Sequence, residues 1–505
     1  MDCIPEWTEK VERIGLDPLG LQNSGVALYQ ALLPAIGNAT PRLRYYGLYC
    51  WLSETYAREL GDTDPVTWRR WVRRCEALYA LAAVAHGNEN GVAGVEWANG
   101  LLKGAGQAID LGPGTEVTGE GLYLKQRLGV FGAAYGSQIV TMGLMQENEN
   151  FRLPVATRDR GRPLAEQFGR AVGNAGRSRI LETIGTGIVS RDALEALFPI
   201  LPSAIDPASD EADAYRRLLF AEDSGAEDGV ARRRSLMLVL RVAAGLGRLP
   251  TPDDIRWRLF DPAGWGLPEA LEAHRLRWEA YQAHDILQLA LAGLLRWSLD
   301  RLGDEDGRLT MADLVEDSAA SLLQAADLDP ASSWRDMVAA HADQGGSRAM
   351  VGDIAAVRHD GRLPPQTAAE ALRLIATLQA RVQARPDLAG ELTRSFSLDL
   401  RARSIRSELH FLEAMLDRPL GEVARALFDE RVLRRHYWVA LLKLRNRDYT
   451  FLFDAQDGRL RKRATYTPVL TTPRLGPALN FLKDIGLLDA SGLNERGRPL
   501  AEAAA

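Results

Sequence analysis

The apolar residues of this chain recur at intervals of three and four over long stretches, which is the spacing of one helix face and not of a strand. The segment from Thr63 to Gly87 shows this most clearly. Thr63 or Asp64 can cap its start, Pro65 suits its first turn, and Gly87 ends it. A second tract, from Pro268 to Leu302, repeats the spacing. The pattern predicts a mainly α-helical protein.

Length and composition place the chain among ordinary globular proteins. Its 505 residues are enough for several domains, with 46% hydrophobic and 25% charged residues. No apolar run approaches the roughly 20 residues that cross a bilayer, and the first residues lack the order of a signal peptide. The three cysteines form no CxxC pair, which favours reduced thiols. We expect a cytoplasmic protein without a membrane partner.

The heptapeptide RGRPLAE occurs twice, at Arg160–Glu166 and at Arg496–Glu502. A predicted helix ending in Gly-Leu, at Gly143 and at Gly486, precedes each copy, and an extended stretch lies between. The glycine of the heptad suits a turn, and its proline suits the first turn of a new helix. Helix, two strands and closing helix resemble the end of a winged-helix unit. We therefore expect two equivalent corners.

The most basic stretch lies between Val432 and Leu475, where ten Lys/Arg stand against three Asp inside a chain of net charge −6. Its sequence RDYTFLFDAQDGRLRKRATYTP predicts a β-hairpin that turns at Asp457 and Gly458. Three arginines should alternate on one face of the return strand and Lys462 should lie on the other. Such a ribbon suits a nucleic-acid backbone, and a solvated or protein-binding face is the alternative. The candidate nucleic-acid-binding residues are Arg459, Arg461, Lys462, Arg463, Arg474, Arg496 and Arg498.

These patterns predict four domains. Residues 1–104 form an N-terminal helical domain and 105–175 a winged-helix-like unit. Residues 176–429 form a central helical domain. Residues 430–505 combine the basic hairpin with a second winged-helix-like unit.

Catalytic and cofactor signatures are not found in the sequence. It contains no phosphate-binding glycine loop, no nucleophile elbow and no HExxH. The stretch DEDGRLTMADLVED misplaces the ligands of a calcium loop and instead predicts a helix capped by Thr310 with Asp313. We therefore expect no cofactor and no metal. Only a dispersed active site remains open, with His284, Asp285 and Glu279 as its candidates.

Two segments resemble a known group of proteins. They are LDPLGLQNSGVALYQALLPAIGNATPRLRYYGLYCWL near the start and YTFLFDAQDGRLRKRATYTP near the end. Both are similar to a poorly characterised family of bacterial proteins encoded in phage-defence neighbourhoods. The resemblance implies a biological setting and transfers no site residues.

The leading hypothesis is a non-enzymatic scaffold or DNA-associated subunit of a bacterial multi-protein anti-phage defence system. Its expected partners are other defence proteins, an ATPase among the candidates, and DNA. One alternative is a kleisin-like bridging subunit of an SMC-type ATPase complex. Another is an effector nuclease with a dispersed active site.

Overall fold

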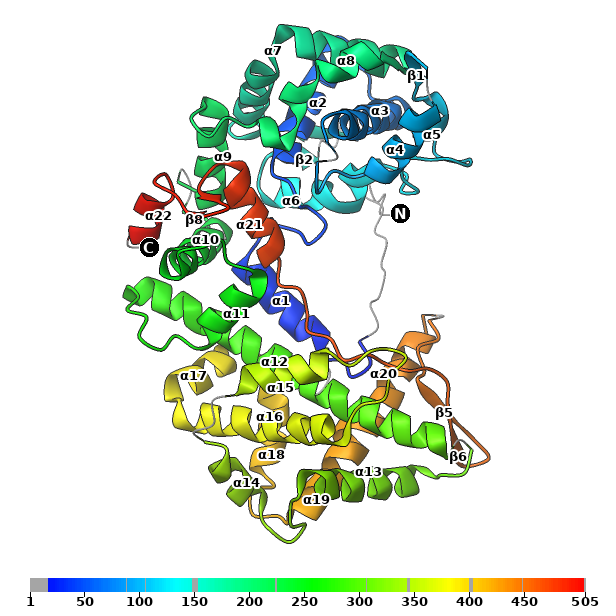
Figure 1. The fold of residues 1–505 in the computed structure, drawn as a ribbon, viewed down its shortest axis with the longest axis vertical. Helices are drawn as coiled ribbons and strands as arrows, with labels where there is room; N and C mark the ends of the chain where they lie inside the picture. The colour runs from blue at the N-terminus through cyan, green and yellow to red at the C-terminus, as the bar shows by residue number, and fades with distance from the viewer. Residues whose placement is uncertain are drawn as a thin grey trace. The chain divides into compact units, whose positions relative to one another are not determined.

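The chain divides into two units, each assembled from segments that are distant in sequence. The computed structural model describes residues 17–503 apart from 88, 105, 148–152, 223–224, 306, 343–345, 399–402 and 447. Of the described residues, unit 1 contains Ala31–Ile255 and 474–503, and unit 2 contains 17–30 and Arg256–Pro473. Both units are mainly helical, as predicted (Figure 1). Within the described part, every helix is too short or too polar to cross a membrane.

The four expected domains stay a prediction, and the division into two units runs across one of them. Residues 430–505 are split at Arg474, so that the basic hairpin belongs to unit 2 and the second heptad copy to unit 1. The reason is packing between remote segments. The last helix, α22 (Arg498–Glu502), and the strand before it pack on α10 (Glu227–Leu246), which lies some 250 residues earlier.

Unit 1 is a helical body whose described residues include three small antiparallel strand pairs. Its strand pairs are β1–β4, β2–β3 and β7–β8. Its principal elements are α2 (Arg44–Glu59), α3 (Pro65–Ala85), α4 (Val95–Gly104), β1 (Ala108–Asp110), α6 (Gly136–Thr141), β2 (Met145–Glu147), β3 (Pro154–Ala156), α7 (Gly161–Thr186), β4 (Ile188–Ser190), α8 (Arg191–Glu195), α9 (Asp210–Phe220), α10, α21 (Leu475–Asp484), β7 (Leu488–Asp489), β8 (Gly492–Leu493) and α22.

Unit 2 is a helical bundle with a single hairpin among its described residues. Helices α1 (Gln22–Leu32) and α11 (Pro252–Phe260) each cross the division between the units. The remaining elements are α12 (Glu269–Asp304), α13 (Met311–Ala326), α14 (Trp334–Ala340), α15 (Ser347–Ala355), α16 (Pro365–Ala384), α17 (Pro386–Ser395), α18 (Ile405–Glu413), α19 (Leu420–Ala426), α20 (Arg434–Leu444), β5 (Phe453–Gln456) and β6 (Arg459–Lys462).

Local sequence signals set the helix starts. Asp64 caps α3 by accepting the backbone N–H groups of Val66 and Thr67, with Pro65 in the first turn. Thr310 and Asp313 form a reciprocal capping box at the start of α13, which confirms the prediction for that segment.

The core of unit 1 is rich in tyrosine. Tyr45 and Tyr49 of α2, Tyr79 of α3 and Tyr135 are all buried, and their rings contact one another. Glu76 of α3 accepts from the Tyr49 hydroxyl at 2.7 Å and is fully enclosed. Burial raises the pKa of Glu76, although its hydrogen bonds act in the opposite direction. The aromatic cluster is therefore core packing.

The core of unit 2 surrounds α12, a 36-residue helix buried on nearly every side. It contacts α13, α16 and α17 among others (Figure 1). Because it is enclosed, its buried charged side chains pair with other protein groups; within the helix, Arg296 Nε donates to Asp300 at 2.9 Å, one turn further along.

Candidate interaction surfaces

The basic hairpin has the geometry that its sequence predicts. Strands β5 and β6 pair antiparallel, with Gln456 opposite Arg459. Asp457 and Gly458 have φ of 52° and 74°, the left-handed values of a two-residue hairpin turn. Phe453 and Leu460 are buried beneath it. The outer face of β6 is thereby left to the three arginines at alternate positions.

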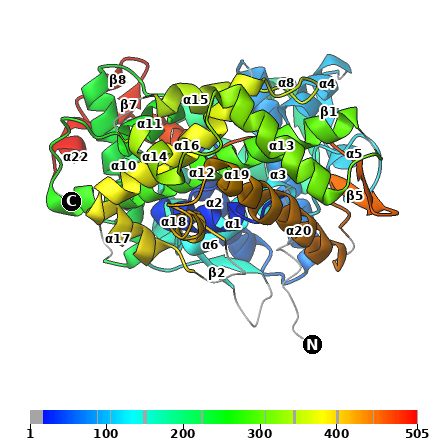
Figure 2. The same cartoon turned by 90° about the horizontal axis from the view of Figure 1, so that it is seen from below.

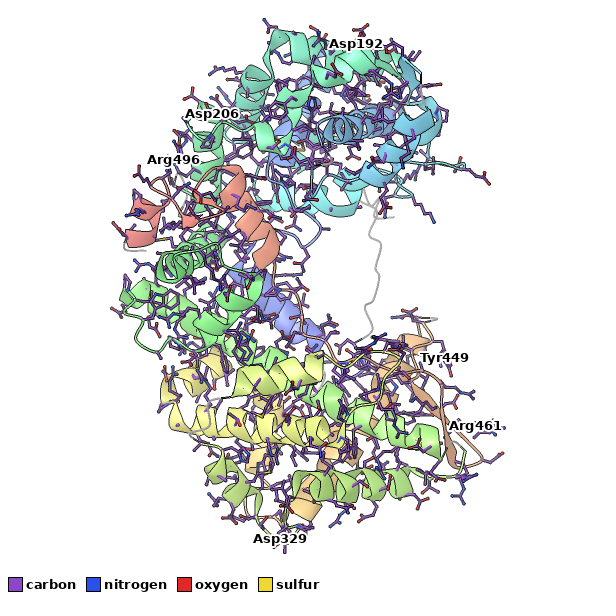
Figure 3. The ribbon with its side chains drawn as sticks, viewed as in Figure 1. Asp192, Asp206, Asp329, Tyr449, Arg461 and Arg496 are labelled. Carbon is purple, nitrogen blue, oxygen red and sulfur yellow. The ribbon has the colours of Figure 1, made fainter. Side chains whose placement is uncertain are left out.

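Two of these arginines have protein partners. Arg459 donates to the Arg308 carbonyl at 2.6 Å, and Arg463 Nε lies 2.7 Å from the Asp454 carboxylate. Arg461 makes no ion pair with any residue that the structure describes, and it lies at the outer edge of the hairpin (Figure 3). The outer face thus contains one arginine, Arg461, that forms no ion pair with the described residues.

The other edge of the hairpin is docked on an acidic part of unit 2. Gly307 N–H donates to the Leu460 carbonyl at 2.9 Å, and Leu460 N–H donates to Leu309 at 2.8 Å. Lys462 Nζ lies 3.6 Å from Asp300, and Arg459 lies 3.8 Å from Asp313. Carboxylates of α12 and α13 therefore compensate part of the positive charge. A count along the chain missed this, because these carboxylates lie about 150 residues away.

The remaining candidate residues lie in unit 1. Arg474 is buried, and its guanidinium donates to the Leu33 carbonyl at 3.0 Å, so we remove it from the candidate surface. Arg496 lies 3.5 Å from Asp213 and is 40% exposed. Arg498 is exposed at the start of α22. Arg459, Arg461, Lys462 and Arg463 therefore form one group, and Arg496 and Arg498 form another on a different unit.

The two heptad copies occupy equivalent corners. Gly143 and Gly486 follow the ends of α6 and α21 with φ of 74° and 65°. In each case the backbone N–H of the next residue, Leu144 or Leu487, donates a hydrogen bond to the carbonyl five residues earlier. A strand pair follows, and the heptad then starts α7 or α22. At Gly161 and Gly497 a side chain would collide with the carbonyl of the residue after the earlier glycine. Sequence repetition thus identified a repeated helix, hairpin and helix.

A groove of about 660 Å³ lies beside the first copy. Pro163 and Leu164 line it together with three arginines and three carboxylates, so its charge is mixed. Its most buried cation, Arg232, donates to the carbonyls of Leu218 and Leu219 at 2.9 and 3.0 Å, at the end of α9. Burial lowers the pKa of Arg232 to about 10. These carbonyls are sufficient partners for the buried Arg232 guanidinium. Its position therefore does not indicate a bound anion in the groove.

The candidates for a dispersed active site are all buried in α12. Asp285 accepts from Thr471 N–H at 3.1 Å, from its hydroxyl at 3.0 Å and from Arg256. His284 Nε2 lies 2.9 Å from the Leu21 carbonyl, and its Nδ1 accepts from Ile405 N–H at 3.0 Å.

Glu279 is likewise enclosed. It pairs with Arg275 at 2.8 Å, Arg381 at 2.6 Å and Arg385 at 3.3 Å. All three candidate side chains therefore have their polar atoms engaged within the protein, as expected for groups that join helices.

Helix α20 exposes an apolar face that sequence analysis overlooked. Trp438, Leu441 and Leu442 are 40%, 42% and 37% exposed. With Arg434 and Arg445 they follow helical spacing and form one stripe, which we call the α20 face. In Figure 2 the helix faces the viewer at the surface of the ribbon. The signal was present in the letters WVALLKLR, but apolar spacing does not tell a buried stripe from an exposed one.

In the part of the chain that the structure describes, no group of three or more His, Cys, Asp or Glu side chains is placed to hold a metal ion.

Comparison with protein-family models, curated proteins and solved structures gave no match to this chain.

Proposed function

We propose that this chain is a non-enzymatic scaffold subunit that binds another protein through the α20 face, within a bacterial anti-phage defence assembly. One observation carries the proposal: of four large apolar side chains on one helix that are more than a third exposed, three lie side by side on one stripe. Exposed apolar residues grouped on one face are typical of protein-binding sites, whereas scattered ones need no explanation. The defence setting comes from the sequence resemblance alone.

The buried candidates of α12 favour this proposal over an effector nuclease. His284, Asp285 and Glu279 each have protein partners for their polar atoms, which supports a structural role for them. A kleisin-like subunit remains the related alternative, and a co-purifying SMC-type ATPase would favour it. We also interpret the two heptad corners as the ends of winged-helix units.

Co-purification from cells that express the neighbouring genes tests the proposal. We expect a partner to be retained in fixed stoichiometry by the wild-type chain and lost by Trp438→Ser. Val469→Ser is the matched control, because Val469 is 52% exposed in the same unit and lies outside the α20 face. Retention of the same partner by Trp438→Ser would contradict the proposal, and an unchanged thermal unfolding midpoint of this variant would show that loss of the partner is a local effect.

A second function, binding of a nucleic-acid backbone, is favoured by the alternation of Arg459, Arg461 and Arg463 on one exposed strand face. Surface ion pairs contribute about 1 kcal/mol or less, so phosphates could replace their carboxylates. We expect Arg461→Glu with Arg463→Glu to weaken DNA binding and to reduce its salt dependence. Arg358→Glu, a substitution of an exposed arginine elsewhere in unit 2, is the control. Equal DNA affinity of the Arg461→Glu, Arg463→Glu variant and the Arg358→Glu control would refute this second function.

A further inference from the structure

The α20 face has a defined length and order of residues. Arg434 and Arg445 stand at its two ends, with Trp438, Leu441 and Leu442 between them. Eleven steps along a helix separate the two arginines, which corresponds to about 16 Å, or three turns. A partner helix of three turns would therefore cover the stripe.

The buried side chains of α20 anchor the helix, so the face is presented rigidly. Arg435 Nε donates to the Leu19 carbonyl at 2.9 Å, and His436 Nε2 accepts from Leu452 N–H at 3.0 Å. The Arg435 guanidinium lies 4.3 Å from the centre of the Trp438 ring and supports its inner side. Because little order must be gained on binding, such a face binds at low entropic cost.

Charge selects the kind of partner. From Arg434 to Arg445 the helix contains four cations and no carboxylate. Exposed Arg434 pairs with half-buried Asp429 at 2.6 Å, a pair near the surface of the sort that contributes little and can be exchanged. Arg445 is exposed and forms no ion pair with the described residues. Acidic residues on a partner would therefore meet a cation at each end of the stripe.

We infer that the α20 face binds an acidic amphipathic helix of another protein, with apolar residues at i, i+3 or i+4 and i+7 and with Glu or Asp near both ends. This inference rests on the proposed function and adds the chemistry of its partner. A second copy of this chain fits less well. In a two-fold contact, antiparallel α20 helices would bring Arg434 of one copy against Arg445 of the other.

A pair of designed helical peptides tests the inference on the full chain. Both have leucines at the stated spacing, and one has Glu at the end positions where the other has Lys. By fluorescence anisotropy, we expect the wild-type chain to bind the Glu peptide about tenfold more tightly than the Lys peptide, with the difference shrinking as salt rises. The double variant Arg434→Glu, Arg445→Glu should bind the Lys peptide more tightly than the Glu peptide. The variant Trp438→Ser should bind both peptides more weakly than the wild type.

Several results would overturn the inference. One is equal affinity of the wild-type chain for the two peptides, or no binding of either. Another is self-association in light scattering that Trp438→Ser abolishes, which would identify a second copy as the occupant. A third is binding that occurs only after residues 1–16 are removed, which would identify an occupant within the chain. If peptide binding fails while co-purification still depends on Trp438, the proposed function stands and only the acidic helix is refuted.

Discussion

At the scale of single residues, two buried histidines hold unit 2 together in the same way. His284 lies between the Leu21 carbonyl and Ile405 N–H, and His436 lies between the Pro18 carbonyl and Leu452 N–H. Each ring must be neutral, because one nitrogen accepts a hydrogen bond while the other donates. Burial lowers the pKa of both, that of His436 to about 4.

This arrangement predicts a loss of stability in mild acid. The unfolded chain protonates these histidines below about pH 6.5, whereas the folded chain keeps them neutral. The stabilisation is therefore fully present above that pH and is lost as the pH falls toward 4, with His436 accounting for about 3 kcal/mol. The measurement is the thermal unfolding midpoint between pH 7.5 and pH 4.5.

The double variant His284→Gln, His436→Gln should be less stable at pH 7.5, with a shallower pH dependence than the wild type. His410→Gln, at an exposed position of α18, should leave that dependence unchanged. Identical slopes for the double variant and the wild type would mean that other groups titrate over this range.

At the scale of elements, the heptad copies could be predicted because they are local. Gly-Leu, the strand pair and the proline in the first turn are each specified by neighbouring residues, and both corners have the predicted order. The hairpin at Asp457 and Gly458 was predictable for the same reason. The compensation of its charge by Asp300 and Asp313, and the burial of Arg474, depend on remote contacts that spacing cannot reveal.

The equivalence of the corners predicts equal sensitivity at Gly161 and Gly497. Alanine at either position would place its Cβ against the carbonyl of Leu144 or Leu487, so the hairpin or the helix must move. We expect each substitution to cost about 2 kcal/mol or more and to lower the unfolding midpoint by about 4 °C or more. Gly245→Ala, in α10 with open space around it, is the control and should not lower the midpoint. If alanine at only one of the two positions lowered the unfolding midpoint, the two corners would not be equivalent.

At the scale of the whole molecule, unit 2 depends on a short segment that comes from the start of the chain. The carbonyls of Pro18, Leu19 and Leu21 accept hydrogen bonds from three side chains of α12 and α20. Neither this dependence nor the split at Arg474 could be predicted, because composition does not change where the chain passes from one unit to the other.

Two truncations of the full chain test this dependence. Removal of residues 1–21 deletes those three acceptors and leaves buried donors without partners, whereas removal of residues 1–16 retains them. We expect the longer truncation to unfold at a temperature lower by several degrees than the shorter one, as followed by circular dichroism. Equal midpoints would show that the segment contributes little to unit 2.

Site-specific photocrosslinking in cells shows whether this protein meets its partner at the α20 face. A photoreactive residue at Leu441 should crosslink to one partner polypeptide in cells that express the neighbouring genes. The same residue at Val469, which is 52% exposed in unit 2 against 42% for Leu441, should not. Crosslinking from Val469 but not from Leu441, or from Leu441 only to nucleic acid, would contradict the account.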